Sequence, residues 1–586
     1  FKKGYNMKKF NKILAAAVLS MVAISSSYAL SVDAAGVDLT EFNKLNVTAN
    51  DKTVHPELVR GSNKKITNGV YDQKMAVKCF NGTFVGKDYG DCQIWRGIPF
   101  AQPPVGELRW KKPLAPQADN GIYEAYTFAK KPLQLFDQEE NSEDCLYLNV
   151  YKGPEDGVKN KPVMVWIHGG GFLAESASDD LYRGEKFIKA NPDVILVTVE
   201  YRLGAVGWMD FSQVPGGENY KEAGVLGSFD QIAALKWVNK NIKKFGGDPK
   251  NVTIFGESAG SVSCNMLPLF KESKGLFQKI IAQSGSLDVI LPPGTRRHIT
   301  QNLLDLTGAK NMEDLKKVPS EVILENYMTI SGGPRCFSPI KDNVYLPHNT
   351  KEMYDRWAKN TKDIIVMMGA NSDEARYCMS TWMGLDVDQA KNFFENSYKL
   401  SKSKLPKEAI AIAENYLASL PDNLERYEKL ERLYTQMSFR QGAATLADIS
   451  PNKNKVYVYE FTPAAQADYA GSFHAAEVEY LFNHKDRLAT FGRNDATTHK
   501  IADQLQKVWV NFAKTGVPSL NGKAFKPWGN DSNTFVFEKN GDIVDVPNFK
   551  AEDTKLLTPL RPYAGVFIFD GFDLDPNKAN PDYEVK

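Results

Sequence analysis

The regular alternation of apolar strands and amphipathic helices is the feature that most constrains this fold. From about residue 160, short continuous apolar runs alternate with stretches whose apolar residues recur at helical spacing. Continuous apolar runs are typical of strands buried on both faces, as in a parallel sheet covered by helices. We therefore expect an α/β protein with a large, mostly parallel central sheet and helices on both faces. The expected strands lie at residues 161–167, 194–199, 251–255, 279–283, 363–368 and 456–461.

The remaining sequence indicates one domain with short extensions. Alternating runs near residues 69–84 and 93–100 predict a small antiparallel addition before the main sheet. The 586 residues are enough for several domains, but no Pro/Ser/Gly-rich linker and no internal repeat divides them. We expect a single domain at residues 66–570. A poorly ordered segment is expected at 30–65 and a tail at 571–586.

The N-terminal sequence is typical of a secretory signal peptide. The basic stretch Met7–Lys12 precedes the apolar run Ile13–Ile24, which is short for a transmembrane helix. Small residues that fit a cleavage site follow, so we expect cleavage after Ala29 or, as a second choice, after Ala34. A membrane anchor is the alternative, and it would need a longer apolar run. We predict a removed peptide at residues 7–29 in a bacterial protein that is secreted, or periplasmic where the host has an outer membrane.

Charge and cysteine content limit the partners of the chain. The formal net charge is +1, so no global field favours nucleic acid or an anionic membrane surface. None of the six cysteines has the spacing of a metal site, and we expect no metal and no cofactor. Export permits disulfides, and Cys79 and Cys92 bracket a short glycine-containing loop. We therefore predict a Cys79–Cys92 disulfide.

The segment Gly256–Gly260, with sequence GESAG, follows the expected strand at 251–255. A serine between glycines at a strand-to-helix turn is typical of a nucleophile elbow, because a Cβ at either flanking position would crowd the turn. An ordinary Gly/Ser turn is the alternative. The motif makes Ser258 the candidate nucleophile, provided that partners for it exist elsewhere.

A second glycine-rich segment, His168–Phe172, follows the expected strand at 161–167. Three consecutive glycines allow backbone N–H groups to face a substrate oxygen, and HGGG together with G-x-S-x-G is a pattern of lipases and esterases. We expect Gly170 and Gly171 to form an oxyanion hole with the N–H of Ala259. A flexible turn is one alternative. A phosphate cradle is another, but no GK[ST] sequence follows.

A general base is expected late in the chain, since enzymes with this motif pair have the order serine, acid, histidine. Three of the seven histidines satisfy that order: His474, His484 and His499. His474 lies among small residues past the strand at 456–461, where a loop suits catalysis. His484 and His499 lie in charged stretches typical of solvated surface, so His474 is the preferred base.

The acid is expected after the strand at 363–368, where Asp373 and Glu374 are adjacent. Neighbouring side chains on a turn cannot both face one histidine, so one orients the base and the other is a surface residue or a helix N-cap. Residue chemistry alone leaves the choice open.

These motifs together make the chain resemble the type-B carboxylesterase family, the cholinesterase-like branch of the α/β-hydrolases. The resemblance extends from about residue 68 to about 540. It also includes the segments Gly97–Gly106, Glu143–Val150 and Phe245–Pro249. It implies an α/β-hydrolase fold and carboxylic ester hydrolysis.

The resemblance also assigns roles to single residues. It selects Glu374 as the acid and His474 as the base, and it implies supporting roles for Glu257 and Ser284. For the acyl pocket it points to three positions: Phe172, Arg335 and Phe337. Arg335 would contact an acidic or phenolic acyl group, or else form a surface salt bridge.

Two departures from the family pattern bear on substrate and on disulfides. Where cholinesterases have a tryptophan that binds choline by cation–π attraction, this chain reads Leu133-Gln134-Leu135-Phe136, so a choline ester is not the expected substrate. The usual partner of the signature cysteine is missing near Lys131, which predicts a free, buried Cys145.

The sequence thus predicts a secreted serine carboxylesterase that acts on small-molecule esters through an acyl-enzyme. A triglyceride lipase is an alternative that calls for a hydrophobic lid, and the loop between Cys79 and Cys92 is too polar for one. The other alternative is a non-catalytic recognition domain of cholinesterase-like fold. Such domains typically lose the serine or the histidine, whereas Ser258 and His474 are both present here.

Overall fold

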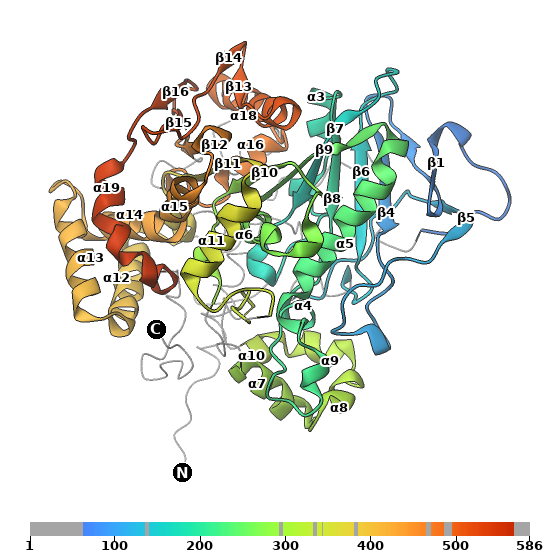
Figure 1. The fold of residues 1–586 in the computed structure, drawn as a ribbon, viewed down its shortest axis with the longest axis horizontal. Coiled ribbons are helices and arrows are strands. Elements are labelled where there is room, and N and C mark those ends of the chain that lie inside the picture. The colour runs from blue at the N-terminus through green and yellow to red at the C-terminus, as the bar shows by residue number, and fades with distance from the viewer. Residues whose placement is uncertain are drawn as a thin grey trace.

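A single large sheet runs through the centre of the molecule (Figure 1). The computed structural model describes residues 63–134, 140–291, 297–331, 337–342, 344–379, 385–464, 470–485 and 495–567. The expected signal peptide and C-terminal tail lie outside these residues. Eleven strands form the sheet in the order β16-β15-β12-β11-β10-β9-β7-β8-β6-β4-β3. Their bounds are β3 Lys87–Asp88, β4 Gln93–Pro99, β6 Tyr147–Lys152, β7 Lys161–Ile167, β8 Ile195–Val199, β9 Gly247–Glu257, β10 Lys279–Gln283, β11 Ile365–Asn371, β12 Val456–Phe461, β15 Thr534–Phe537 and β16 Ile543–Val546.

The inner strands of this sheet are parallel and the outer ones antiparallel. The run from β15 through β12, β11, β10, β9 and β7 to β8 is parallel throughout. Strands β6, β4 and β3 on one side and β16 on the other pair antiparallel. The prediction of a mostly parallel central sheet is confirmed, and the strands expected at 161–167, 279–283 and 456–461 have those bounds.

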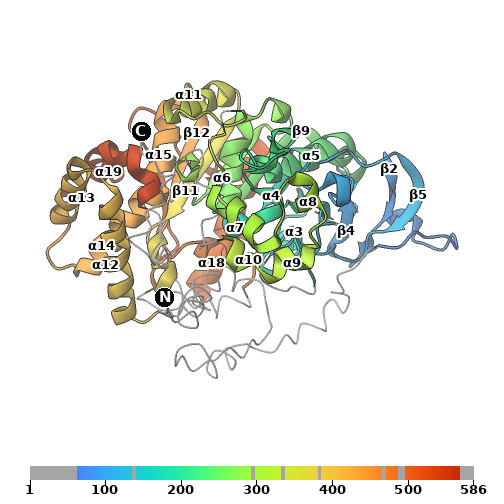
Figure 2. The same cartoon turned by 90° about the horizontal axis from the view of Figure 1, so that it is seen from below.

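The small N-terminal addition differs in part from the expectation. It consists of β1 (Ala76–Cys79), β2 (Asn81–Val85) and β5 (Asp119–Glu124), and it stands at one end of the molecule (Figure 2). Strands β1 and β2 are antiparallel, but β2 and β5 are parallel. The run expected at 93–100 belongs instead to the main sheet as β4. Nearly every residue of β4 is buried, as expected of a strand covered on both faces.

Helices cover both faces of the sheet. Because successive strand residues point to opposite faces, Val165 and Ile254 join the core on one face while Trp166 and Phe255 join the core on the other. Helix α5 packs on the first face and α18 on the second, on opposite sides in Figure 2. The helices are α3 Glu185–Ala190, α4 Gly204–Gly207, α5 Leu226–Asn241, α6 Ala259–Met266, α7 Arg297–Thr307, α8 Met312–Lys316, α9 Ser320–Glu325, α10 Tyr327–Ser331, α11 Thr350–Thr361, α12 Val387–Lys404, α13 Lys407–Ser419, α14 Arg426–Thr435, α15 Gln441–Ile449, α16 Ala476–Leu481, α18 Ala496–Thr515 and α19 Ala551–Leu557.

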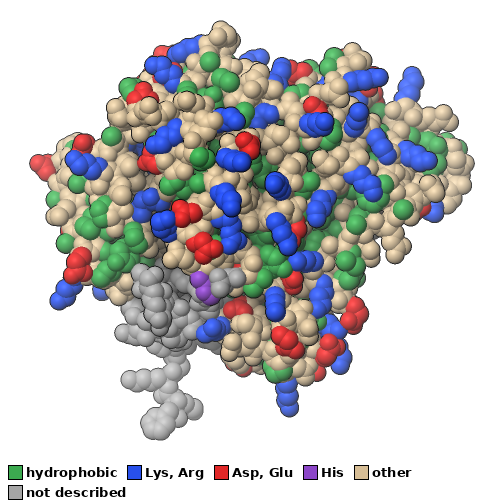
Figure 3. Space-filling view, in the orientation of Figure 1, with side chains coloured by type: hydrophobic (Ala, Val, Ile, Leu, Met, Phe, Trp, Pro, Cys, Tyr) green, Lys and Arg blue, Asp and Glu red, His purple; other side chains and the backbone are tan. Residues whose placement is uncertain are grey.

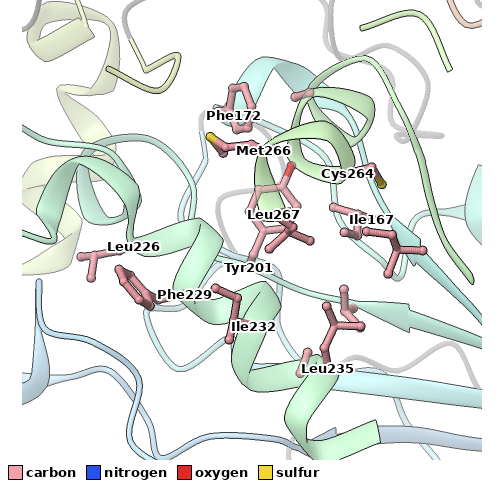
Figure 4. Packing of buried hydrophobic residues seen from close by; sticks show 14 of the residues in the cluster. Ile167, Phe172, Tyr201, Leu226, Phe229, Ile232, Leu235, Cys264, Met266 and Leu267 are labelled. Carbon is pink, nitrogen blue, oxygen red and sulfur yellow. The ribbon is translucent and has the colours of Figure 1, made fainter. Parts of the chain in front are cut away.

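Helix α5 is buried over most of its length, and apolar residues at helical spacing join it to the core. Leu226, Phe229, Ile232 and Leu235 recur at helical spacing and lie along the side of α5 that joins the core (Figure 4). Short 3₁₀ geometry continues from Ile242 to Phe245, and Gly246 ends it at a φ of 92°, a left-handed conformation that favours glycine.

A separate helical layer packs beside the sheet and carries its own core. Helices α12, α13, α14 and α19 lie together on the left of Figure 1, around buried side chains such as Phe394, Leu430 and Tyr434. Directly after α14, residues 436–440 form a π-helix, a rare geometry that is frequent at functional sites. This layer borders the loops that follow β11 and β12.

The predicted disulfide is wrong, because Cys79 and Cys92 are both free and buried. Each lies in a different apolar cluster, and burial raises the pKa of both thiols, that of Cys79 to about 12. Residues 80–91 between them contain β2 and β3, and the two side chains join different cores. The expectation of a free, buried Cys145 is confirmed. Lys131, where the sequence lacks the usual partner of Cys145, has its Nζ 2.9 Å from Asp179 Oδ1 in a buried ion pair.

The face drawn in Figure 3 carries charged side chains of both signs. On the face drawn in Figure 3, Lys and Arg side chains are dispersed, with Asp and Glu among them. Among the described helices, none combines the length and apolarity needed to cross a bilayer.

Candidate active site

The candidate residues gather where neighbouring parallel strands end. Five parallel strands are neighbours in the sheet, in the order β12-β11-β10-β9-β7. Each is followed by a loop that carries a candidate group. The carboxyl ends of parallel strands meet at one edge of a sheet, where α/β enzymes place their chemistry. The groups are His168–Phe172 after β7, Ser258 after β9, Ser284 after β10, Glu374 after β11 and His474 after β12.

Ser258 occupies a strained turn between β9 and α6. Its φ of 56° and ψ of −120° are unfavourable for a residue with a Cβ, which indicates that the surrounding packing imposes the conformation. A Cβ on Gly256 would lie 2.5 Å from the carbonyl oxygen of Ile167, and one on Gly260 would lie 2.0 Å from the same atom. Both flanking positions must therefore be glycine, for the steric reason that the sequence suggested. Ser258 is half-buried at the N-terminus of α6.

The glycine loop after β7 lies against this turn. A Cβ on Gly169 would be 3.3 Å from Ser258 Cβ, so the two segments are in contact. Gly170 and Gly171 have φ values of 80° and 62° and begin a 3₁₀ turn, while Ala259 begins α6. The first N–H groups of a helix have no partner inside it. Within the described residues, no other hydrogen bond uses the N–H of Gly170, Gly171 or Ala259.

Aromatic and hydrogen-bonding contacts of Tyr201 stabilise the glycine loop at residues 168–172. The Tyr201 hydroxyl donates to the carbonyl oxygens of His168 and Gly169, at 2.9 and 3.1 Å. The His168 ring stacks on Tyr201 with centroids 4.3 Å apart, and complete burial lowers the pKa of His168 to about 3. His168 is therefore a neutral support for the loop at physiological pH.

His474 and Glu374 form a close pair. His474 Nδ1 lies 2.6 Å from Glu374 Oε2, so the ring N–H donates to a buried carboxylate. The other carboxylate oxygen, Oε1, accepts from Ser284 Oγ at 2.5 Å and from the backbone N–H of Asn371 at 2.6 Å. These donors fix the orientation of Glu374, and Glu374 fixes that of the imidazole.

Asp373, the neighbouring acid, faces a different partner. Its carboxylate accepts from the backbone N–H of Ser472 at 3.0 Å, and its own N–H donates to the Ser472 carbonyl oxygen at 3.1 Å. In addition, the N–H of His474 donates to the Glu374 carbonyl oxygen at 3.2 Å. Asp373 thus ties the loop after β11 to the loop that carries His474, while Glu374 contacts the ring.

The second ring nitrogen of His474 faces the nucleophile strand. Nε2 lies 3.2 Å from Glu257 Oε1, one residue before Ser258. Burial raises the pKa of Glu257 well above its ordinary value, with further contributions from the carboxylates of Glu477, Glu175 and Glu374. Glu257 therefore lies beside the imidazole of His474 in a setting that disfavours the ionised form of its carboxyl group.

A buried polar chain behind the site was not expected from the sequence. Glu477 Oε2 accepts from Asn371 Nδ2 at 2.6 Å, and Glu477 Oε1 accepts from Gln283 Nε2 at 3.0 Å. Trp509 Nε1 continues the chain by donating to Gln283 Oε1 at 3.0 Å. The signal in the sequence was the polar residue that ends each of two largely apolar strands, Gln283 in β10 and Asn371 in β11.

The residues proposed for the acyl pocket have differing environments. Phe172 is buried against Trp208, with centroids 4.6 Å apart, and Phe337 is fully buried against Tyr327 at 5.5 Å. Arg335 lies outside the described residues. Phe439, from the π-helix, was not anticipated and lies with its ring 4.7 Å from that of His474.

The remaining late histidines lie elsewhere. His484 is buried, not solvated as its charged neighbours suggested, and its Nε2 donates to the Leu181 carbonyl oxygen at 2.9 Å. His499 is half-buried in the first turn of α18. Local composition misled the prediction for His484 because tertiary packing, not the neighbouring sequence, decides burial. Among the described residues there is also no group of three His, Cys, Asp or Glu side chains arranged to bind a metal ion.

Comparison with known proteins agrees with this architecture. Residues 73–552 match the carboxylesterase family. The chain is 33% identical over 449 residues to para-nitrobenzyl esterase of Bacillus subtilis, covering 72% of this chain and 86% of that one. It is 31% identical to fumonisin B1 esterase of Sphingopyxis macrogoltabida over 494 residues, covering 81% and 86% of the two chains.

Solved structures give the same result. A carboxylesterase of Geobacillus stearothermophilus has a TM-score of 0.70 and 31% identity, over 82% of this chain and 99% of that one. The α/β-hydrolase fold and the resemblance to type-B carboxylesterases are both confirmed. With its sequence match, its sheet and the groups at its strand ends in agreement, the chain belongs to the carboxylesterase family and is a carboxylic ester hydrolase.

Proposed function

We propose that the chain hydrolyses carboxylic esters through an acyl-enzyme formed on Ser258, with His474 as general base and Glu374 as the acid that orients it. The contact that carries this proposal is the 2.6 Å pair of His474 Nδ1 and Glu374 Oε2, with Nε2 turned toward the Ser258 turn. Glu374 keeps the proton on Nδ1, so Nε2 is available to accept one.

Acylation begins with attack by Ser258 Oγ on the ester carbonyl carbon. The hydroxyl proton passes to His474 Nε2, and the carbonyl oxygen becomes an oxyanion that accepts from the N–H groups of Gly170, Gly171 and Ala259. As the intermediate collapses, the C–O bond to the alcohol breaks and the leaving oxygen takes the proton from Nε2. An acyl-Ser258 ester remains.

Deacylation repeats these steps with water as nucleophile. His474 Nε2 removes a proton from water as the oxygen attacks the acyl carbon, and the same N–H groups donate to the second oxyanion. Collapse breaks the bond to Ser258 Oγ, which regains its proton from Nε2. The carboxylic acid leaves, and no cofactor enters the balance.

The substrate class is a small-molecule carboxylic ester, and choline esters are disfavoured by the sequence at residues 133–136, which lacks the tryptophan of cholinesterases. Two of the similar proteins are named for different esters, para-nitrobenzyl and fumonisin B1. The acyl group that the enzyme prefers is therefore the property that a substrate panel should measure. Arg335 favours an acidic or phenolic acyl group, and Arg335→Ala should change the ranking of acyl substrates if it contacts them.

We further propose that the protein is exported. The basic stretch Met7–Lys12 and the apolar run Ile13–Ile24 support this, followed by cleavage after Ala29. N-terminal sequencing of protein recovered outside the cytoplasmic membrane should begin at Leu30. An uncleaved N-terminus in the membrane fraction would contradict this proposal.

The activity is tested by hydrolysis of an ester panel that spans acetyl to long-chain, aromatic, feruloyl-type and choline esters. Ser258→Ala should lower kcat roughly a million-fold, as loss of the nucleophile does in serine hydrolases. Retention of the full rate by Ser258→Ala would refute the mechanism. A non-catalytic recognition domain is the other candidate, and it would give no hydrolysis with any ester and no reaction with a fluorophosphonate.

A further inference from the structure

Glu175 is a buried acid placed directly after the oxyanion loop. It is 3% exposed and adopts a φ of 72°, a left-handed conformation that is costly for any residue except glycine. Its backbone is held on both sides by one amide side chain. The Glu175 N–H donates to Gln134 Oε1 at 3.0 Å, and Gln134 Nε2 donates to the Glu175 carbonyl oxygen at 2.9 Å. A buried acid in a strained backbone conformation is a candidate for a functional role.

The side chain of Glu175 packs on the glycines of the oxyanion loop. A Cβ on Gly170 would lie 3.0 Å from Glu175 Cγ and 3.3 Å from its carboxyl carbon. On the neighbouring residue, a Cβ on Gly169 would lie 3.1 Å from Glu257 Oε2. The loop is therefore enclosed between two buried glutamates, and Glu175 fills the space beside the glycine whose N–H is a proposed oxyanion donor.

The carboxyl group of Glu175 is surrounded by other titratable groups. Tyr182 Oη donates to Oε2 at 2.5 Å, and the N–H of Gly169 also faces the carboxyl group. Asp179 raises the pKa of Glu175 and Lys131 lowers it, while the charge of Glu175 in turn raises the pKa of Glu257 and Tyr201. Burial is the largest influence, and the resulting pKa of Glu175 is about 8.

The charge state of Glu175 bears on the reaction because the transition state is negative. A neutral acid beside Gly170 leaves the oxyanion donors unopposed. An ionised carboxylate a few ångströms away repels the oxyanion that forms on the other side of the loop, in a setting with little water to screen it.

We propose that Glu175 is a positioning residue for the oxyanion loop, and that it supports turnover in its neutral form and opposes it once ionised. This inference rests on the proposed function of Gly170 as an oxyanion donor. It predicts a loss of activity at alkaline pH that is caused by a group other than the triad.

The test is the pH profile of kcat/KM between pH 6 and pH 10, measured with an uncharged ester whose products do not titrate in that range. The wild type should lose roughly tenfold or more of its kcat/KM, with a midpoint near the pKa of Glu175, which is about 8. Glu175→Gln keeps the shape and removes the titration, so its profile should stay flat at alkaline pH. A merely structural role would lower the rate at every pH and leave the slope unchanged.

A matched control is Glu431→Gln, which removes a different fully buried carboxyl group whose pKa is raised to about 7. This variant should keep the alkaline decline. A wild type without an alkaline decline, or an unchanged decline in Glu175→Gln, would overturn the proposal.

A second variant covers the case in which Glu175→Gln does not fold. The Tyr182 hydrogen bond lowers the pKa of Glu175, so Tyr182→Phe should move the midpoint of the decline to higher pH. An unmoved midpoint in Tyr182→Phe would also overturn the inference. Ser258→Ala in the same buffers separates the two proposals, because its residual rate tests the nucleophile whatever the shape of the profile.

Discussion

Glu374 Oε2 lies 2.6 Å from His474 Nδ1, although the two residues are 100 positions apart in the chain. The acid next to Glu374 in the chain, Asp373, accepts instead from the backbone N–H of Ser472. One acid orients the imidazole and the other holds the loop that carries it. This division gives adjacent carboxylates different roles, which substitution can separate.

Glu374→Gln should lower kcat by about 10⁴-fold, because an amide at this position permits the wrong histidine tautomer. Asp373→Asn is the matched control, since it removes the neighbouring charge without touching the ring. It should lower the melting temperature and reduce kcat much less. Equal losses of kcat in the two variants would contradict the assignment of Glu374.

Ser284→Ala should reduce kcat about tenfold with little change in KM. The Ser284 hydroxyl donates to Glu374 Oε1 at 2.5 Å, and a hydrogen bond to a charged group contributes about 1.5–3 kcal/mol. The N–H of Asn371 still holds the carboxylate in the variant, which limits the loss. Steady-state kinetics on one ester gives both constants, and an unchanged kcat would show that Ser284 does not position Glu374.

Gly260→Ala should destabilise the elbow strongly. The added Cβ would lie 2.0 Å from the Ile167 carbonyl oxygen, and overpacking of this kind typically costs about 1–3 kcal/mol. Gly224→Ala is the control, because its Cβ would meet nothing closer than 3.4 Å. Thermal unfolding should show a large drop for the first variant and little for the second. Equal melting temperatures would show that the elbow tolerates a Cβ.

The five described cysteines should behave as free, unreactive thiols. Cys79, Cys92, Cys145, Cys264 and Cys378 are all buried, and burial raises the pKa of each, which suppresses the reactive thiolate. A thiol reagent should label them slowly in the native protein and fully after denaturation. A melting temperature that falls on addition of a reductant would indicate a disulfide and contradict the structure.

The central sheet could be predicted because each strand has a recognisable pattern in its own local sequence. Residues 161–167, 279–283 and 456–461 are largely apolar on both faces, a pattern typical of a covered, parallel strand. The two glycine motifs were equally clear, since backbone conformations with positive φ select glycine. Ser258, Gly170 and Gly171 could therefore be named as candidate site residues from the sequence alone.

The rest of the site depends on contacts between distant segments. Residue chemistry could not choose between Asp373 and Glu374, because the choice is made by the Ser472 backbone about a hundred residues away. The burial of His484 and the separation of Cys79 from Cys92 are likewise set by which core each side chain joins. Glu175 gave a weak signal, an acid within an otherwise small and apolar loop, whose meaning required its contact with Gly170.

The most direct test of the account is to trap the acyl-enzyme. The enzyme is mixed rapidly with an excess of a nitrophenyl ester. If deacylation is slower than acylation, the nitrophenol released in the initial burst should equal the enzyme concentration. Acid quenching followed by peptide mass analysis should find the acyl group on the peptide that contains Ser258, and none in Ser258→Ala. Recovery of the acyl group on another residue, or undiminished turnover by Ser258→Ala, would contradict the central claim.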